Sequence, residues 1–342
     1  MKLQPSHKLD QFGGIDNVNI PTELEQVNDA GHTYFFQRAE NFDLTNKRNM
    51  RRRDGYRVLS SHTNLHSLWA HGDNCFFMDG DKLYRLNADF TTTLLLDDFA
   101  LTPMNYQQVY GKTYFTNGSE IGWIDEDGVS PLPTTTDEFK LTMPPGHLME
   151  FYNQVLYVAV GNIVYCSDPL FPAQYDFRRG LIPFESRITM LKAVDDGLWV
   201  SDSEGIYFLN GSTVYDFSSQ SRQVSPVIER SAVVIDGRFL GTDSNAKTVI
   251  MLTPSGICLG SNGGNFLVPT GDRYHGSEFF IVESAFVRIS NDRYQYLVMG
   301  RYYQSGAPIE LLAGFQVLSM DSEMNNTWSL PFLQVQLTAT FA

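Results

Sequence analysis

The stretch NQVLYVAVGNIVYCSDP (residues 153–169), together with ITMLKAVDDGLWVSDSEGIYFLNG (residues 188–211), decides the fold. Short runs rich in Val, Ile, Tyr and Trp are separated by a few residues of Gly, Asn, Asp and Ser, which is the pattern of antiparallel β-hairpins. Apolar residues do not recur every 3.6 positions over the length that a helix requires. We therefore predict a meander made only of strands.

A unit of four such strands recurs along the chain. The first unit reads LHSLWAH, NCFFMD, KLYRLN and TTLLLDDF, three similar units follow it, and a fifth is looser. Equivalent positions in the second strands are 38, 43, 42 and 40 residues apart, at Phe77, Phe115, Val158, Val200 and Leu240. Four strands in every 40 residues or so are typical of a β-propeller blade. The predicted fold is all-β, a β-propeller of about six four-stranded blades, with five to seven as the range.

The sixth unit is incomplete in the sequence. Residues 283–303 supply two clear strands, SAFVRIS and YQYLVMGRYY. We expect N-terminal strands at 34–37 and 56–59 to complete this blade and close the ring, because a closed ring leaves no long free strand edge. The predicted organisation is an extended N-terminal arm at 1–33, the propeller at 34–306, and C-terminal strands at 307–342 that close the ring or contact a partner.

The chain is acidic, with 25 Lys and Arg against 39 Asp and Glu and a net charge of −14. Residues 1–60 contain nine basic and eight acidic side chains, so the acidic excess belongs to the remaining residues. That body should repel nucleic acid, and only the N-terminal part could attract it.

Three cysteines, Cys75, Cys166 and Cys258, lie far apart in or beside apolar runs. This placement predicts buried thiols in a reducing compartment and no disulfide framework. The sequence shows neither the apolar core of a signal peptide nor a run of about 18 apolar residues, so we expect folding in a cytoplasm without membrane insertion.

Several short motifs resemble ligand sites but lack parts that those sites need. His62, His66 and His71 occur in a stretch with no helical pattern, so we predict no zinc site there. The acidic turn at 125–128 lacks the alternating oxygen ligands and the distant Glu of a calcium loop. No Gly-Lys-Ser/Thr follows the glycine-rich segment at 260–264, which argues against a phosphate site. We predict no metal and no cofactor.

No catalytic arrangement stands out in the sequence, which contains no nucleophile elbow, no Cys beside a His and no isolated carboxylate pair. Among the charged segments, one stands out, the basic cluster in KRNMRRRDGYR (residues 47–57). It either protects a strand edge with solvated charge or docks on the acidic body of a neighbouring subunit or on DNA phosphates.

Two phrases of the sequence resemble virion proteins of tailed bacteriophages. AENFDLTNKRNMRRRDGYRVL (residues 39–59) is similar to the segment that precedes the propeller in that group. YCSDPLFPAQYDFRRGLIPFESRITMLKAVDDGLWVSDSEGIYFLNG (residues 165–211) resembles a later part of the same group. The similarity extends over about residues 34–215 and rests on structural motifs. The chain is shorter than the larger nozzle proteins, which carry additional domains.

The resemblance implies a tail nozzle, tail hub or packaged-DNA-stabilisation protein, present as a homo-oligomeric ring around the DNA channel, with six copies as one stoichiometry. Its partners would be other tail or connector subunits, and DNA would pass without specific binding because the wall is acidic. We expect a non-enzymatic protein of the virion tail, assembled in the cytoplasm of the host bacterium. The candidate subunit-interface residues are Arg48, Arg51, Arg52, Arg53, Tyr175, Arg178 and Arg179.

Two alternative functions remain open. Trp69, Trp123 and Trp199 could stack on sugar rings at one mouth of the ring, which would make the protein a carbohydrate-binding or carbohydrate-active propeller. Their positions in predicted strands favour a place in the blade core instead. The other alternative is a cytoplasmic protein-interaction propeller. Turnover of host surface glycans would support the first alternative, and structural phage genes on either side of this one would support the virion protein.

Overall fold

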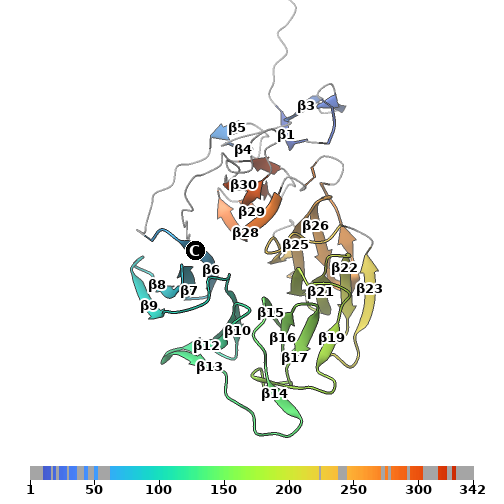
Figure 1. Cartoon of the computed structure of the whole chain (residues 1–342). Helices are drawn as coiled ribbons and strands as arrows, with labels where there is room; N and C mark the ends of the chain where they lie inside the picture. Colours follow the sequence, from blue (N-terminus) through green and yellow to red (C-terminus); the bar gives the residue numbers. More distant parts are fainter. Residues whose placement is uncertain are drawn as a thin grey trace, which may run out of the picture.

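The computed structural model describes residues 11–16, 18–20, 23–28, 31–36, 42–44, 50–52, 62–222, 225–237, 245–270, 274–275, 279–290, 293–302, 315–321 and 326–328. Strands dominate these residues and form six four-stranded antiparallel sheets and three smaller sheets. The six sheets follow one another along the chain around a common centre (Figure 1). The protein is therefore a six-bladed β-propeller, as the strand spacing predicts.

The blades use consecutive strands, with one exception in the third. Blade one contains β6 (Leu65–His71), β7 (Asn74–Asp79), β8 (Lys82–Leu86) and β9 (Thr92–Leu96), and blade two contains β10 (Asn105–Val109), β11 (Lys112–Thr116), β12 (Ile121–Asp125) and β13 (Gly128–Pro131). Blade three contains β15 (Leu148–Tyr152), β16 (Val155–Val160), β17 (Ile163–Cys166) and β19 (Leu181–Pro183), and blade four contains β20 (Met190–Ala193), β21 (Gly197–Ser201), β22 (Ile206–Asn210) and β23 (Ser218–Arg222). Blade five contains β24 (Val233–Asp236), β25 (Lys247–Thr253), β26 (Gly256–Ser261) and β27 (Phe266–Leu267), and blade six contains β28 (Phe279–Ser290), β29 (Arg293–Tyr302), β30 (Phe315–Asp321) and β31 (Asn326–Trp328).

The first strand of every blade lies at the centre of the ring. These six strands contact one another in the order β6, β10, β15, β20, β24 and β28, and β28 contacts β6 again. The ring therefore closes through its inner strands, between the first and the last blade (Figure 1).

The expected closure by N-terminal strands is wrong for the residues that the structure describes. Blade six takes all four strands from its own part of the chain, because β30 pairs with β29 from Gln295 to Arg301 and leaves that edge of β29 no place for an N-terminal strand. The segment expected at 34–37 belongs, up to Phe36, to β3 (Gly31–Phe36), which pairs with β1 (Phe12–Ile15) and β2 (Glu25–Asn28). The segment at 56–59 lies outside the described residues. The sixth blade extends past residue 306 to Trp328.

The small N-terminal sheet packs on the outside of the ring near blade six. β1 and the short strand β4 (Phe42–Leu44), which pairs with β5 (Met50–Arg52), contact the outer strand β31. Phe36 stacks on Phe12 at 5.0 Å between ring centroids and packs against the apolar cluster between blades five and six. The N-terminal strands thus cover the last blades and do not belong to them (Figure 1).

The second strand of the fifth blade also differs from its prediction. Leu240 was expected to lie in this strand, but it is outside the described residues, and β25 is the second strand of the blade. A second strand is packed between two neighbouring blades and must be apolar on both faces. β25 meets this condition, since Val249, Ile250, Met251 and Leu252 are fully buried.

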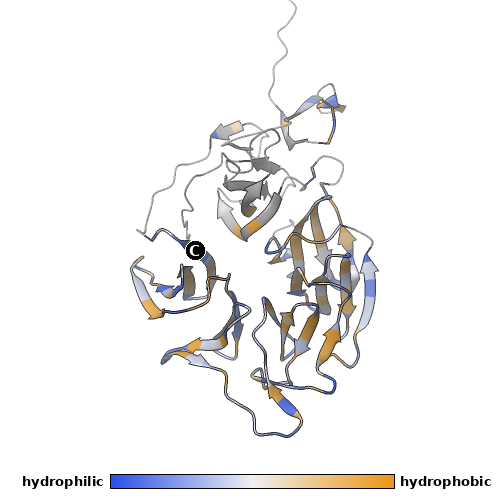
Figure 2. Ribbon diagram, in the orientation of Figure 1, coloured by the Kyte–Doolittle hydropathy of each residue, from blue (hydrophilic) through white to orange (hydrophobic). Residues whose placement is uncertain are grey.

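Each second strand divides its side chains between two interfaces. In β16, Leu156 and Val158 pack toward blade two, whereas Tyr157 and Ala159 pack toward blade four. The same alternation recurs in β25, where Val249 faces blade four. Burial on both faces explains why these strands read as continuous apolar runs (Figure 2).

Hydroxyl groups near the ends of second strands link neighbouring blades. The Thr116 hydroxyl accepts a hydrogen bond from Gly146 N at 2.9 Å and lies 2.8 Å from Gly146 O, and Gly146 belongs to the segment that enters blade three. Ser201 makes the corresponding link to blade five, because its hydroxyl accepts from Val227 N at 3.0 Å. These buried hydroxyls hold the connections between blades two and three and between blades four and five.

Replacement of Thr116 by valine keeps the shape of the side chain but leaves the buried Gly146 amide without its acceptor. We expect the free energy of unfolding to fall by about 1–3 kcal/mol, measured by urea denaturation. Thr136→Val, at an exposed threonine, is the matched control and should change it by less than about 0.5 kcal/mol. Equal effects of the two substitutions would contradict the link.

The three cysteines are buried and unpaired, as the sequence predicts. Burial raises the pKa of the Cys75 and Cys258 thiols to about 11, so neither is a thiolate at neutral pH. Among the described residues, no helix has the length and apolar composition needed to cross a bilayer.

Candidate functional site

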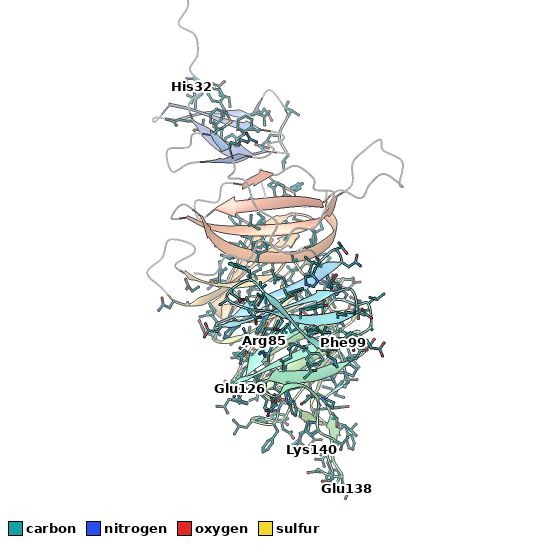
Figure 3. The ribbon with its side chains drawn as sticks, turned by 90° about the vertical axis from the view of Figure 1, so that its left-hand side faces the viewer. His32, Arg85, Phe99, Glu126, Glu138 and Lys140 are labelled. Atoms are coloured by element: carbon teal, nitrogen blue, oxygen red, sulfur yellow. The ribbon has the colours of Figure 1, made fainter. Side chains whose placement is uncertain are left out.

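An insertion in blade three forms a small sheet outside the ring. Its strands are β14 (Lys140–Thr142), from the segment between blades two and three, and β18 (Gln174–Asp176), which lies between β17 and β19. Both Asp168 oxygens accept from the Lys140 ammonium, at 2.7 and 2.8 Å, and fix the turn beside this sheet. We call residues 137–142 and 168–180 the flap. Figure 3 shows Glu138 and Lys140 at the end of the molecule farthest from His32.

A buried carboxylate organises the turn that follows β18. Asp176 is only 2% exposed, and both of its oxygens accept from the Arg178 guanidinium, from Nε at 2.9 Å and from Nη2 at 2.7 Å. The Arg178 backbone N–H adds a third hydrogen bond at 3.0 Å. The hydrogen bonds from Arg178 hold the pKa of the Asp176 carboxyl well below its usual range. Arg178 thus stabilises the flap from within.

The outer side of the flap combines arginine with exposed aromatic rings. The Arg178 guanidinium lies 4.1 Å from the Phe139 ring centroid, and the Arg179 guanidinium lies 5.3 Å from that of Tyr215. Arg179 is 63% exposed, Tyr215 is 62% exposed, and Phe139 and Phe177 are also exposed. We define these five residues as the flap surface. Aromatic and arginine side chains are the types enriched at the centres of protein interfaces.

The structure separates the two groups of predicted interface residues. Arg178 and Arg179 belong to the flap surface, whereas Tyr175 is 7% exposed and packs edge-on against Tyr165, with the ring centroids 5.2 Å apart. Tyr175 therefore belongs to the core between blades two and three.

The described part of the basic cluster, residues 50–52, lies far from the flap. Figure 1 places β5, which carries Arg51 and Arg52, at the opposite side of the molecule from β14. Arg52 is exposed there, and the backbone of Arg51 pairs with Asp43. Arg48 and Arg53 lie outside the described residues.

Three members of the flap surface, Phe139, Phe177 and Tyr215, are not among the interface residues predicted from the sequence. Phe139 is an isolated aromatic residue in the polar linker after blade two, which is a signal that sequence inspection could have used. Tyr215 lies in the turn before β23, which starts at Ser218.

A second polar cluster lies on the inner strands. Glu150 on β15 accepts from Gln107 Nε2 on β10 at 3.4 Å, and its other oxygen lies 3.5 Å from the Lys192 ammonium on β20. The three residues are 43 and 42 positions apart, the same spacing as the blades, so they occupy equivalent places in three consecutive blades. Burial raises the pKa of the Glu150 carboxyl, and Lys192 opposes that rise. A single buried carboxylate, with an amide partner on one side and a cationic partner on the other, therefore joins three consecutive blades.

The raised pKa of Glu150 predicts a pH dependence of stability. A carboxyl whose pKa is higher in the folded than in the unfolded state favours folding when protonated, and this contribution is lost as the pH rises from its ordinary pKa through the folded one. We therefore expect Glu150→Gln to gain stability relative to the wild type as the pH rises from about 4 to neutral. Urea denaturation across this range measures the difference. Glu126→Gln, at an exposed glutamate, should show no such trend, and parallel curves for Glu150→Gln and the wild type would contradict the assignment.

The other ligand-like motifs serve the fold. His62 Nδ1 lies 2.7 Å from Asp79 Oδ2, and His66 Nε2 lies 3.0 Å from Gly80 O, so both histidines fix the turn between β7 and β8. In the glycine-rich segment, Gly263 N donates to Asp196 Oδ2 at 2.7 Å, so a carboxylate of the protein occupies the backbone N–H. Among the described residues, no group of three or more His, Cys, Asp or Glu side chains is placed to hold a metal ion.

Comparison with solved structures finds propellers of several functions. The chain matches a streptogramin B lyase over 82% of its own length and 86% of the lyase, with 12% identity and a TM-score of 0.46. It matches a gluconolactonase from Xanthomonas campestris over 71% and 85%, with 13% identity and a TM-score of 0.46. It matches the WD40 domain of Neurospora crassa Pan2 over 85% and 83%, with 12% identity and a TM-score of 0.42.

These likenesses concern the fold alone. The matched propellers include enzymes and a WD40 domain, so they select no activity for this chain. No protein-family model and no curated protein matches the sequence.

Proposed function

We propose that this chain is a structural subunit of a tailed-bacteriophage virion, which assembles into a ring at the tail or at the head-to-tail connection. The flap surface is the observation that carries the proposal. The insertion between β17 and β19 adds a sheet that no blade requires, and it presents aromatic and arginine side chains to solvent. Such a surface suits contact with another protein.

Two further properties support the same function. The excess of acidic over basic side chains in residues 61–342 would let DNA move past the subunit without forming phosphate contacts that ejection must break. The similarity of residues 34–215 to tail nozzle and hub proteins concerns segments that build blades and the flap.

Mass spectrometry of purified virions tests the proposal. We expect the protein in the particle at a low integer multiple of the portal number, and we expect the purified protein to leave host surface glycans uncleaved. Absence from the virion would overturn the proposal, and glycan turnover would favour the carbohydrate-active alternative.

A surface variant tests the part that the flap takes in assembly. Arg178 clamps the buried Asp176, so its replacement would disturb the flap itself. Arg179→Glu combined with Tyr215→Ala leaves that clamp intact and should lower the yield of complete particles while the isolated subunit stays folded. Tyr110→Ala, at an exposed tyrosine that is not part of the flap, is the matched control. Normal particle yield from the Arg179 and Tyr215 variant would remove the flap from the assembly interface.

A further inference from the structure

The outer strand of blade one is the least protected strand edge among the described blades one to five. β13 and β19 each end in proline, β23 is the polar segment SSQSR, and β27 has only two residues. β9 has the sequence TTLLL, with neither proline nor charge. Proteins normally protect such edges, because an unpaired apolar strand attracts another chain.

The side chains of this edge are apolar and acidic. Leu94 is 48% exposed and Leu96 is 42% exposed, and Figure 2 shows the apolar character of this strand. Asp97 and Asp98 follow directly and are exposed. No Lys or Arg occurs between residues 86 and 111, and across the sheet Lys82 on β8 lies next to Leu83, which pairs with Leu96. We define Leu94, Leu96, Asp97 and Asp98 as the acidic edge.

The acidic edge complements the flap surface in both respects. Each surface has exposed apolar side chains beside charged ones. Asp137 and Glu138 of the flap are exposed and act on Arg178, so the charge that complements Asp97 and Asp98 is that of Arg179. The guanidinium groups of Arg178 and Arg179 lie against the rings of Phe139 and Tyr215, and the carboxylate that they share, Asp176, is buried. Arg179 has the weaker hold on Asp176, at 3.4 Å, and its donors remain available to a second carboxylate.

The two surfaces cannot meet within one molecule. β9 lies at one side of the ring, and β14 of the flap lies at another (Figure 1). Contact between them must join two copies, through different surfaces on each copy. A contact of this heterologous kind, repeated from copy to copy, produces a closed ring when its rotation closes.

We propose that the acidic edge of one copy receives the flap surface of the next copy, with Arg179 paired to Asp97 or Asp98 and Tyr215 packed against Leu94 and Leu96. This inference rests on the proposed function, since it names the two surfaces through which the virion ring forms.

Cysteine cross-linking of the full chain tests the contact. The native thiols are buried, so introduced cysteines are the reactive ones. Leu96→Cys and Tyr215→Cys, mixed as two separate proteins and oxidised, should give a disulfide-linked dimer that contains one of each. A protein with both substitutions should give larger closed species. Val27→Cys, at an exposed position of the N-terminal sheet, replaces Tyr215→Cys in the control and should give no dimer with Leu96→Cys.

A charge exchange provides an independent readout. Arg179→Asp and, separately, Asp97→Arg with Asp98→Arg should each weaken self-association by about tenfold, measured by sedimentation velocity. The variant that carries all three substitutions should recover most of the lost association. No mixed dimer, or no recovery in the exchanged variant, would overturn the proposed contact. Presence of the protein in virions would then keep the proposed function and reject only this pair of surfaces.

Discussion

Replacement of Trp199 by alanine is expected to lower the free energy of unfolding by about 3–5 kcal/mol, the largest effect of any single substitution that we consider. Trp199 is fully buried on β21, and its ring lies 4.9 Å from that of Phe208 and 5.9 Å from that of Phe266. It fills the interface between blades four and five together with Val249 and Met251. Alanine would leave a cavity that the two sheets cannot close, because each is fixed by its own hydrogen bonds.

Urea denaturation followed by circular dichroism measures this loss without depending on tryptophan fluorescence. Trp199→Phe is the matched variant, and it should cost clearly less because it keeps an aromatic ring. Leu94→Ala removes a large apolar side chain at an exposed position and should stay within about 0.5 kcal/mol of the wild type. A loss for Trp199→Ala no larger than that of Leu94→Ala would show that the ring is not part of the core.

The burial of Trp199 also bears on the carbohydrate alternative. A ring that is fully buried between two blades has no face left for a sugar. Trp123 has one face covered by the Lys112 ammonium, 4.1 Å from its ring centroid, and Trp69 packs against Phe76 and Tyr106. The three tryptophans therefore serve mainly the blades, as their strand positions indicated.

The repeat was readable in the sequence because every blade needs the same parts. The spacing selected equivalent residues in the second strands, and these pair with equally spaced residues of the first strands. The pairs are Phe115 with Tyr106, Val158 with Met149 and Val200 with Leu191, and within each strand set consecutive residues are 43 and then 42 positions apart. The second and third strands of blades two and four are joined by turns in which Asn117 and Asp202 accept backbone N–H groups. Spacing and turn residues are local signals, so they predicted the blades well.

Long-range pairings were harder to predict. The flap joins β14 to β18 across more than thirty residues, and the contact of Arg178 with Phe139 follows from that pairing alone. No local sequence pattern predicts such a contact. The cluster of Gln107, Glu150 and Lys192 could have been predicted from the sequence, because the blade spacing aligns these three residues in the first strands. The closure of blade six was mispredicted since its outer strands follow a long interval after β29.

Replacement of Gly260 by alanine should lower the free energy of unfolding by about 1–3 kcal/mol. The reason is close packing against a neighbouring side chain, since Gly260 lies in a strand and not in a turn. Gly260 lies on β26 in blade five, and a Cβ atom built there would lie 2.7 Å from Cε2 of Trp199. Met251 Cε would lie at 3.1 Å, but the end of that flexible side chain can move, whereas the indole is held by Phe208 and Phe266.

The same geometry predicts that the two substitutions are not additive. In the Trp199→Ala protein the indole is gone, so the methyl group of alanine at position 260 would enter the space that it leaves. The cost of Gly260→Ala should then vanish or change sign, which corresponds to a coupling energy of about 1–3 kcal/mol in a double-mutant cycle. Urea denaturation of the four proteins measures it. Additivity to within about 0.5 kcal/mol would show that the glycine is not required by the tryptophan, and that blades four and five are not fitted to each other at this point.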